Sequence, residues 1–307
     1  MRSPCRLGQT RGMELWVIFA VLAAAAQTVR FAVQKVLAGG RLSPAAATWA
    51  RFLFSAPLVA VLAISYGSIT DQAIPSPTPA FWAYALVGGV TQILATICTV
   101  TLFSMRAFAV GITFKKTEVM LTALVGLILL GDAVSIWGAL AIAIGFLGVL
   151  LLSDPPEGGS LFNRASALGL LSGVFFAFSA VTYRGATLEI TTDDPILTGG
   201  ATLAIVTLWQ TVILGLWLAW KEPGQIRATL AAWRQSAIVG ATSLVGSWCW
   251  FAAFSLANAA YVFAVGQVEL IFSLMVGWLW FRERVSAREV LGMSVLTVSI
   301  LVVSFAG

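Results

Sequence analysis

Residues 80–103 read AFWAYALVGGVTQILATICTVTLF, a stretch of 24 residues without a charged side chain. A helix rises about 1.5 Å per residue. About 20 apolar residues are therefore enough to cross the hydrocarbon core of a bilayer. The stretch predicts a membrane-spanning helix.

Nine further stretches share this length and apolar character, namely 14–36, 45–66, 107–130, 134–153, 165–187, 196–220, 234–256, 260–281 and 285–304. Apolar residues make up 59% of the sequence and charged residues 10%, whereas a soluble domain carries roughly 25% charged residues. The mean hydropathy is +0.94. Alternating segments typical of a membrane β-barrel are not seen. We therefore expect an all-α integral membrane protein with ten transmembrane helices.

Several function classes are excluded by what the sequence lacks. It has no histidine, which excludes Ser–His and Cys–His catalysis and the HExxH metal site. The three cysteines are too far apart for a zinc ribbon or a disulfide framework, being Cys5, Cys98 and Cys249. We expect no metal site and no cofactor. The net charge of +5 is scattered along the chain, so we do not expect nucleic acid as a partner.

The two halves of the sequence repeat one another. A shift of 151 residues places Glu118 on Glu269 and Asp132 on Glu283, and both glutamates lie inside apolar runs. Five spans per half is an odd number, so the halves would lie in the membrane with opposite orientation. Such inverted repeats are characteristic of secondary transporters. We expect an N-terminal tail at 1–12 (or a start-site artefact), a first repeat at 13–153, a linker at 154–164 and a second repeat at 165–307.

Each half also contains a similar pair of helices at its end. The first half has FSMRA at 103–107 and LGD at 130–132, and the second has FSLAN at 254–258 and FRER at 281–284. In this pattern the chain resembles the EamA family of the drug/metabolite transporter superfamily, over nearly its whole length from Met13. The charges of Lys115, Lys116 and Glu118 exceed what a generic member has in its fourth helix.

The resemblance implies a carrier that moves small metabolites without ATP and often exports them. The inverted halves predict alternating access around a central site, and the excess of cations over carboxylates inside the spans indicates a substrate with a carboxylate, such as an amino or organic acid. The resemblance also implies a multi-pass protein of the bacterial inner membrane. Expected partners are a small-molecule substrate and the lipid bilayer, with a homodimer left open. Proton coupling is left open as well. The alternatives are an intramembrane enzyme, for which the sequence offers only Asp193-Asp194 as an acidic pair, and a non-transporting receptor.

Charges inside the predicted spans are candidates for function, because burying a charge in hydrocarbon is costly. Glu118 and Glu269 could accept a proton or bind a cation. For Glu118 the alternative is a structural ion pair with Lys115, three residues away. Glu269 has no basic neighbour one turn away, so its partner would come from another helix, a substrate or a proton. Lys115 and Lys116 point to different faces, so at most one would line a cavity shared with Glu118.

A polar stripe lies on the first span, where Gln27, Arg30 and Gln34 are spaced by three and four residues. The Arg30 guanidinium could bind a carboxylate or phosphate of the substrate. The alternative is an ion pair from Arg30 to one of the two glutamates. For Arg51 we expect a position near the membrane interface, with its charge extended toward water.

Trp248 and Gln267 complete the candidate binding residues. Aromatic side chains near Gln267 and Glu269 could form the wall of a substrate pocket. The alternative for Trp248 is ordinary packing or a place in the aromatic belt at the membrane interface. Tyr183 and Arg184 are open to the same interfacial interpretation.

The orientation of the chain is predicted differently by two arguments. The loops after spans 1, 3, 5, 7 and 9 contain ten Lys and Arg residues, against three on the opposite side, all before Met13. The positive-inside rule therefore places both termini outside the cytoplasm. The family resemblance implies that both are inside.

Overall fold

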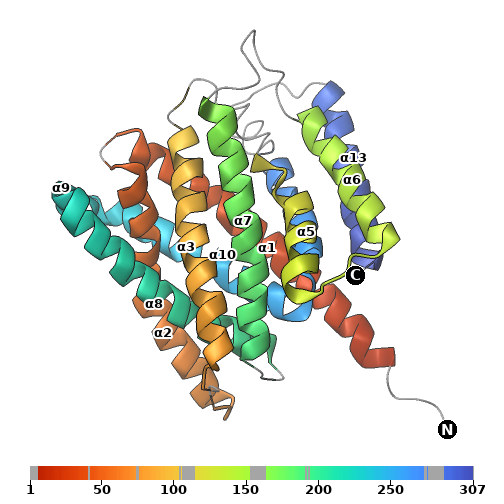
Figure 1. Ribbon diagram of the computed structural model, residues 1–307, viewed down its shortest axis with the longest axis horizontal. Helices are drawn as coiled ribbons and strands as arrows, with labels where there is room; N and C mark the ends of the chain where they lie inside the picture. Colours follow the sequence, from red (N-terminus) through yellow and green to blue (C-terminus); the bar gives the residue numbers. More distant parts are fainter. Residues whose placement is uncertain are drawn as a thin grey trace.

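The protein is described by a computed structural model in which the described residues are 6–40, 42–73, 76–103, 105, 115–152, 164–190, 192, 194–272, 275 and 287–306. Among these residues, all regular secondary structure is helical (Figure 1). The expected all-α class is therefore confirmed for this part of the chain. Of the linker expected at 154–164, residues 154–163 lie outside it, and Arg164 is the first residue of a helix.

Six helices in the described part are long and apolar enough to cross a membrane. They are α1 (Arg6–Ala38), α2 (Pro44–Ile69), α3 (Pro79–Leu102), α7 (Arg164–Glu189), α8 (Pro195–Lys221) and α10 (Trp233–Leu256). The remaining helices are α5 (Glu118–Leu130), α6 (Ile136–Leu152), α9 (Pro223–Ala231), α11 (Ala259–Gly266) and α13 (Ala287–Ala306). Four shorter apolar stretches correspond to predicted spans four, five, nine and ten. Ten spans in an inverted repeat stay a prediction.

Three of the long helices begin with the same local chemistry. Ser43, Thr78 and Asp194 each precede a proline, and each side-chain oxygen accepts a backbone N–H of the first turn. Such a cap satisfies a donor that has no partner within the helix. The proline that follows is suited to the first helical position, since it has no N–H to leave unpaired. These three starts agree with the predicted spans to within two residues.

The helices pack mainly in pairs that join the two halves of the chain. In Figure 1, α3 lies beside α7, and α6 lies beside α13 at one edge of the bundle. In the same way α1 packs against α10, and α2 packs against α8. The main buried apolar cluster is built largely on α1, α3, α7, α10 and α11. The centre of the protein therefore lies between the halves, not within either one.

Glycines allow two of these close approaches. A Cβ added at Gly199 of α8 would lie 2.7 Å from the backbone nitrogen of Ala252 in α10. A Cβ added at Gly173 of α7 would lie 2.9 Å from the carbonyl oxygen of Lys115. Real Cβ atoms do not come this near to backbone, so only glycine fits at these two positions without a shift of a helix. The second contact sets α7 directly against the segment that precedes α5.

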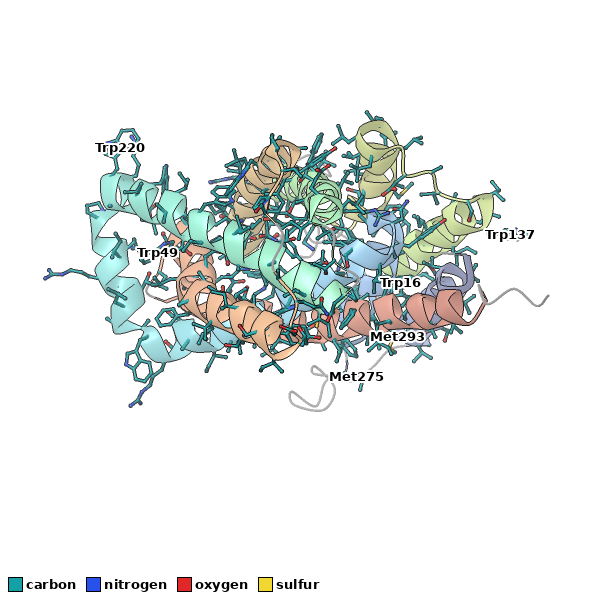
Figure 2. The ribbon with its side chains drawn as sticks, turned by 90° about the horizontal axis from the view of Figure 1, so that it is seen from below. Trp16, Trp49, Trp137, Trp220, Met275 and Met293 are labelled. Carbon is teal, nitrogen blue, oxygen red and sulfur yellow. The ribbon has the colours of Figure 1, made fainter. Side chains whose placement is uncertain are left out.

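The outside of the bundle is apolar. Trp220 is 74% exposed and Trp137 is 67% exposed, and Figure 2 shows them at opposite edges of the molecule. Exposed leucine, isoleucine and valine side chains cover α2, α5, α6, α8 and α13. A continuous apolar surface of this kind is far larger than the patches found on soluble monomers. The bundle is therefore suited to contact with lipid on its sides.

The two ends of the bundle differ in charge. At the end that holds α9, Ser43 donates to Glu222. The described charged side chains of this basic end are Lys35, Arg164, Lys221, Glu222, Arg227, Arg234 and Arg288. At the acidic end they are Asp71, Asp132, Arg184, Glu189 and Asp194. The start of α1 and the end of α13 both lie toward the acidic end in Figure 1.

This charge difference predicts the orientation. The basic end is expected in the cytoplasm, which places the C-terminus outside. Alkaline phosphatase fused after the last residue should be active, and a green fluorescent protein fused there should be dark. The triple variant Lys221→Gln, Arg227→Gln, Arg234→Gln should reduce the phosphatase signal, because it removes half of the described basic side chains at that end. A fluorescent, phosphatase-inactive fusion would contradict the prediction.

Candidate functional site

The helical backbone is interrupted at equivalent places in the two halves. In the first half, Lys116 and Thr117 form a turn, and α5 begins at Glu118. In the second half, α11 ends at Gly266, Gln267 forms a turn, and helical backbone resumes over 268–272. Lys116 and Gln267 are 151 residues apart, which is the shift that relates the two halves. Interrupted helices inside a membrane protein occur where the backbone is buried in protein or lines a cavity.

Charged side chains gather at these two interruptions. The ammonium of Lys115 lies 3.2 Å from a carboxylate oxygen of Glu118. The ammonium of Lys116 lies 3.7 Å from Glu269 Oε2 and thereby connects the first half to the second. Lys115, Lys116 and Glu118 are buried, and the Glu269 side chain is 14% exposed. Both ion pairs are therefore largely removed from water, where charge interactions are strong.

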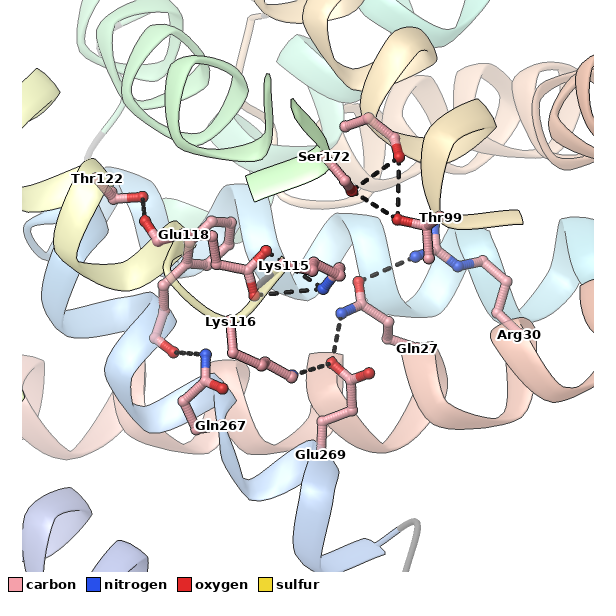
Figure 3. A network of polar contacts seen from close by, with 12 residues as sticks. Gln27, Arg30, Thr99, Lys115, Lys116, Glu118, Thr122, Ser172, Gln267 and Glu269 are labelled. Carbon is pink, nitrogen blue, oxygen red and sulfur yellow. Dashed lines mark hydrogen bonds and ion pairs between the residues drawn. The ribbon is translucent and has the colours of Figure 1, made fainter. Parts of the chain in front are cut away.

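Two residues of α1 continue this network, as Figure 3 shows. The amide nitrogen of Gln27 donates to Glu269 Oε2 at 2.9 Å. The Arg30 guanidinium donates through Nη2 to the amide oxygen of Gln27 at 3.0 Å. The Gln27 amide thus lies between a guanidinium and a carboxylate and satisfies both. Arg30 is 3% exposed, and its Nε has no hydrogen-bond partner.

Arg51 of α2 brings a second buried guanidinium to the site. Its Nε donates to Ser243 Oγ at 2.6 Å, and its Nη2 donates to Ser247 Oγ at 2.9 Å. A longer contact of 3.5 Å joins Nη1 to Thr96 Oγ1. Arg51 is 3% exposed. The expectation that its charge extends toward water at the interface is therefore wrong, because hydroxyl groups of α3 and α10 solvate it inside the bundle.

These groups surround one cavity of about 30 Å³. Its polar wall includes Gln27, Arg30, Arg51, Gln92, Lys115, Glu118, Ser179, Tyr183, Ser247, Gln267 and Glu269. Its other wall is aromatic, and Trp250, Phe254 and Phe263 form ring contacts with centroids 5.4 to 6.0 Å apart. The arrangement can hold a small molecule with a charged or polar group and an apolar part.

A neutral hydrogen-bond network borders the same cavity. The Tyr183 hydroxyl donates to Gln92 Oε1 at 3.0 Å. The Gln210 amide nitrogen is 3.2 Å from the Tyr183 hydroxyl and donates to the Gly89 carbonyl oxygen at 3.0 Å. Tyr183 is 1% exposed, so it does not anchor the chain at the membrane interface. This network ties α3, α7 and α8 together on one side of the cavity.

The structure brings together most of the residues that the sequence singled out. Gln27, Arg30, Lys115, Glu118, Gln267 and Glu269 line the cavity. Lys116 reaches Glu269 but borders a second, smaller cavity with Ile142, Phe146 and Ser299. The expectation that at most one of the two lysines lines a cavity shared with Glu118 agrees with this geometry. The expectation that the partner of Glu269 comes from another helix agrees with it too.

Two of the predicted residues lie elsewhere. The Gln34 amide nitrogen donates to the Ala47 carbonyl oxygen of α2 at 3.0 Å. The Trp248 indole donates to the Ile196 carbonyl oxygen of α8 at 2.8 Å. Neither side chain lines the cavity described above, and both connect neighbouring helices. Among the described residues no group of three or more Cys, Asp or Glu side chains is placed to hold a metal ion.

Sequence reasoning missed Arg51, Gln92, Tyr183, Ser179 and Ser247 as cavity residues. A signal for Arg51 was available in α10, where Ser243 and Ser247 are four residues apart and share one helical face. Two hydroxyls one turn apart in an apolar helix indicate that something polar lies opposite. Which helix supplies that group depends on the packing of α2 against α10, which the sequence pattern does not show.

The ion pair between the halves predicts coupled effects on stability. Lys116→Met and Glu269→Gln should each lower the midpoint of thermal unfolding in detergent, because each leaves its partner charge without compensation. Removing one member of a buried pair typically costs about 3–5 kcal/mol. The double variant should lose less than the sum of the singles, with a coupling of about 0.5–3 kcal/mol. The exposed Arg227→Gln serves as the control, and strictly additive losses would contradict a direct interaction.

Comparisons with known proteins concern the fold and the family of this chain. A solved structure described as "Crystal structure of protein" matches with a TM-score of 0.69 and 13% identity, over 95% of this chain and 96% of that one. At this identity the match shows the fold alone. No curated protein matches the sequence. The model of the EamA-like transporter family matches residues 163–305. This match confirms the resemblance found in the sequence: the second half of the chain belongs to the EamA-like transporter family of the drug/metabolite transporter superfamily.

Proposed function

We propose that this protein is a secondary-active membrane transporter that carries small organic anions, such as organic or amino acids, by alternating access. Members of the family are membrane transporters and not enzymes. The observation that carries the proposal is the central cavity, where two interrupted helices bring charged groups from both halves of the chain to one place. In secondary transporters the substrate site lies at such an interface between repeats.

The packing of the helices supports two halves related by exchange. The helices of one half can be matched to those of the other, with α1 matched to α7 and α10 matched to α3. Under this matching, the packed pair α1–α10 corresponds to the packed pair α7–α3. With α5 matched to α11, the pair α5–α7 likewise corresponds to the pair α11–α1. The pairs α2–α8 and α6–α13 each correspond to themselves, because their two helices are matched to each other. A bundle with this symmetry has a second arrangement in which the halves trade roles. Inverted repeats provide alternating access in this way.

The size of the cavity supports a conformational step. A volume of about 30 Å³ has room for about two water molecules. An organic acid needs more space, so the helices around the cavity must move apart before a substrate can enter. We therefore assign this conformation to a nearly closed stage of the transport cycle. Export from the cytoplasm, and a place in the bacterial inner membrane, remain part of the proposal as the family resemblance implies them.

The charges around the cavity support an anionic substrate. Arg30, Arg51 and Lys115 line the cavity with two carboxylates, those of Glu118 and Glu269. Lys116 reaches Glu269 from the neighbouring cavity. Guanidinium groups bind carboxylate and phosphate through paired N–H donors. A substrate anion would reduce the positive excess, and the aromatic wall would contact the rest of the molecule.

Transport by purified protein tests this function. Proteoliposomes should take up at least one member of a panel of radiolabelled amino and organic acids. Arg30→Gln and Arg51→Gln should each reduce the initial rate at low substrate concentration by about tenfold or more, because each removes charge-assisted hydrogen bonds worth about 1.5–3 kcal/mol. Arg227→Gln, on the exposed face of α9, should leave the rate unchanged. Binding of a panel member without any uptake would indicate a receptor and overturn the proposal.

Proton coupling is tested separately. With no histidine in the chain, Glu118 and Glu269 are the carboxylates at the cavity that could carry a proton. Uptake driven by an imposed pH gradient should be lost in Glu118→Gln or Glu269→Gln. Exchange of labelled for unlabelled substrate, which needs no net proton movement, should persist. Gradient-driven uptake that is unchanged in the double variant would remove both carboxylates from the coupling.

A further inference from the structure

We propose that the cavity is built for a small anion with two negative charges, and not for a zwitterion. This inference rests on the proposed function and concerns the same site. It follows from the partners of four cations, of which three line the cavity and the fourth, Lys116, borders the neighbouring one. Lys115 is paired with Glu118, and Lys116 with Glu269. The two arginines have no carboxylate within ion-pair distance among the described residues, and their hydrogen-bond partners are neutral.

Arg51 has donors to spare. A guanidinium carries five N–H donors. Three donor contacts are made, to Ser243, Ser247 and Thr96, and the last is long at 3.5 Å. At least two N–H groups on the terminal nitrogens are therefore unused, and Arg51 lines the cavity. A carboxylate or phosphate in the cavity can accept both of them.

Arg30 is less well satisfied than Arg51. Among the described residues, its guanidinium donates to Gln27 alone, and its buried Nε has no hydrogen-bond partner. The side chain is 3% exposed and lines the same cavity. The charge of Arg30 is close enough to interact with the charge of Arg51 and, in the opposite sense, with that of Glu269. Two neighbouring guanidinium groups with unused donors form an anion site with two positive charges.

The excess charge decides between substrate classes. Among the described residues, the three cations that line the cavity (Arg30, Arg51 and Lys115), together with Lys116, which pairs with Glu269 from the neighbouring cavity, exceed the two carboxylates by two formal positive charges. Burying uncompensated charge is costly. A zwitterionic amino acid leaves the excess at two, a monocarboxylate reduces it to one, and a dianion removes it. The alternative is loss of protons from the cations, but arginine does not lose its proton in proteins, and the lysines already have carboxylate partners.

Dicarboxylates and phosphate monoesters share the required chemistry. Both are small, both carry two negative charges near neutral pH, and both accept bidentate hydrogen bonds from guanidinium. The hydroxyls of Ser179, Ser247 and Tyr183 on the cavity wall can donate to the remaining oxygens of either. The property that the two classes share is the double negative charge. An experiment with one compound of each class shows which class binds.

The test uses the purified full-length protein and four probes: succinate, glycerol 3-phosphate, acetate and alanine. Apparent affinities are measured from the concentration dependence of the thermal unfolding midpoint, and transport is measured by uptake into proteoliposomes. At least one dianion should bind tenfold or more tightly than acetate and alanine. Binding of succinate but not of glycerol 3-phosphate would identify a dicarboxylate as the ligand, and the reverse result would identify a phosphate monoester.

Variants separate charge from structure. Arg51→Gln should weaken the bound dianion by at least tenfold and should bring its affinity close to that of acetate. Arg51→Lys, which keeps the charge, should retain part of the affinity. Arg30→Gln provides a second position if Arg51→Gln does not fold, and Arg227→Gln is the control on the surface. Each variant is accepted only if it elutes as a single species in detergent.

The outcomes distinguish this inference from the proposed function. If alanine is transported as well as either dianion, and Arg51→Gln does not change the preference, the inference is overturned and the transporter stands. If a dianion binds but no probe and no member of the wider acid panel is taken up, the dianion site stands and the proposed function fails. If no dianion binds, the inference is overturned whatever else the protein carries.

Discussion

The buried ion pair between Lys116 and Glu269 is the contact on which the site depends, because it joins the two interrupted helices across the halves. Each interruption releases backbone groups and places ionisable side chains deep in an apolar bundle, at a cost that grows with the loss of water. The ion pair between Lys116 at one interruption and Glu269 at the other offsets part of that cost. The Gln27 amide extends the pair to α1, so the helix that carries Arg30 is held in register with both halves.

The same contact makes the site sensitive to the relative position of the halves. The ammonium of Lys116 has no hydrogen bond, and at 3.7 Å its contact with Glu269 is at the long end for an ion pair. Gln267 lines both the central cavity and the smaller one beside Lys116, and its amide oxygen is also unpartnered. When the two halves move relative to each other, the Lys116 ammonium can therefore donate a new hydrogen bond and the Gln267 amide oxygen can accept one. By contrast, the absence of a side chain at Gly173 lets α7 pack directly against the Lys115 carbonyl group.

Much of this could be predicted from the sequence, and the limits have physical reasons. Apolar runs longer than a bilayer needs, with Ser43, Thr78 and Asp194 as caps, define helices whatever their neighbours are. Glu269 stands out because nothing else in its run is charged, and Glu118 stands out because Lys115 and Lys116 are the only other charges in its run. Arg51 did not stand out, because a guanidinium two turns from a helix start can reach water as easily as a cavity. Gln34 and Trp248 share faces with polar residues but meet α2 and α8, and helix partners are not encoded in periodicity.

The distribution of residue types suits a carrier that responds to its substrate. Lysine, which loses its proton readily when buried, occurs at the interruptions and is paired there with glutamate. At the cavity, Arg30 and Arg51, which keep their charges, occur on the continuous helices α1 and α2, and their hydrogen-bond partners are neutral. The continuous helices thus carry the arginines without ion pairs, and the interrupted segments carry the paired charges. An anion that neutralises the arginines stabilises the conformation in which they face one another, and a ligand shifts an equilibrium by its difference in affinity for the two states.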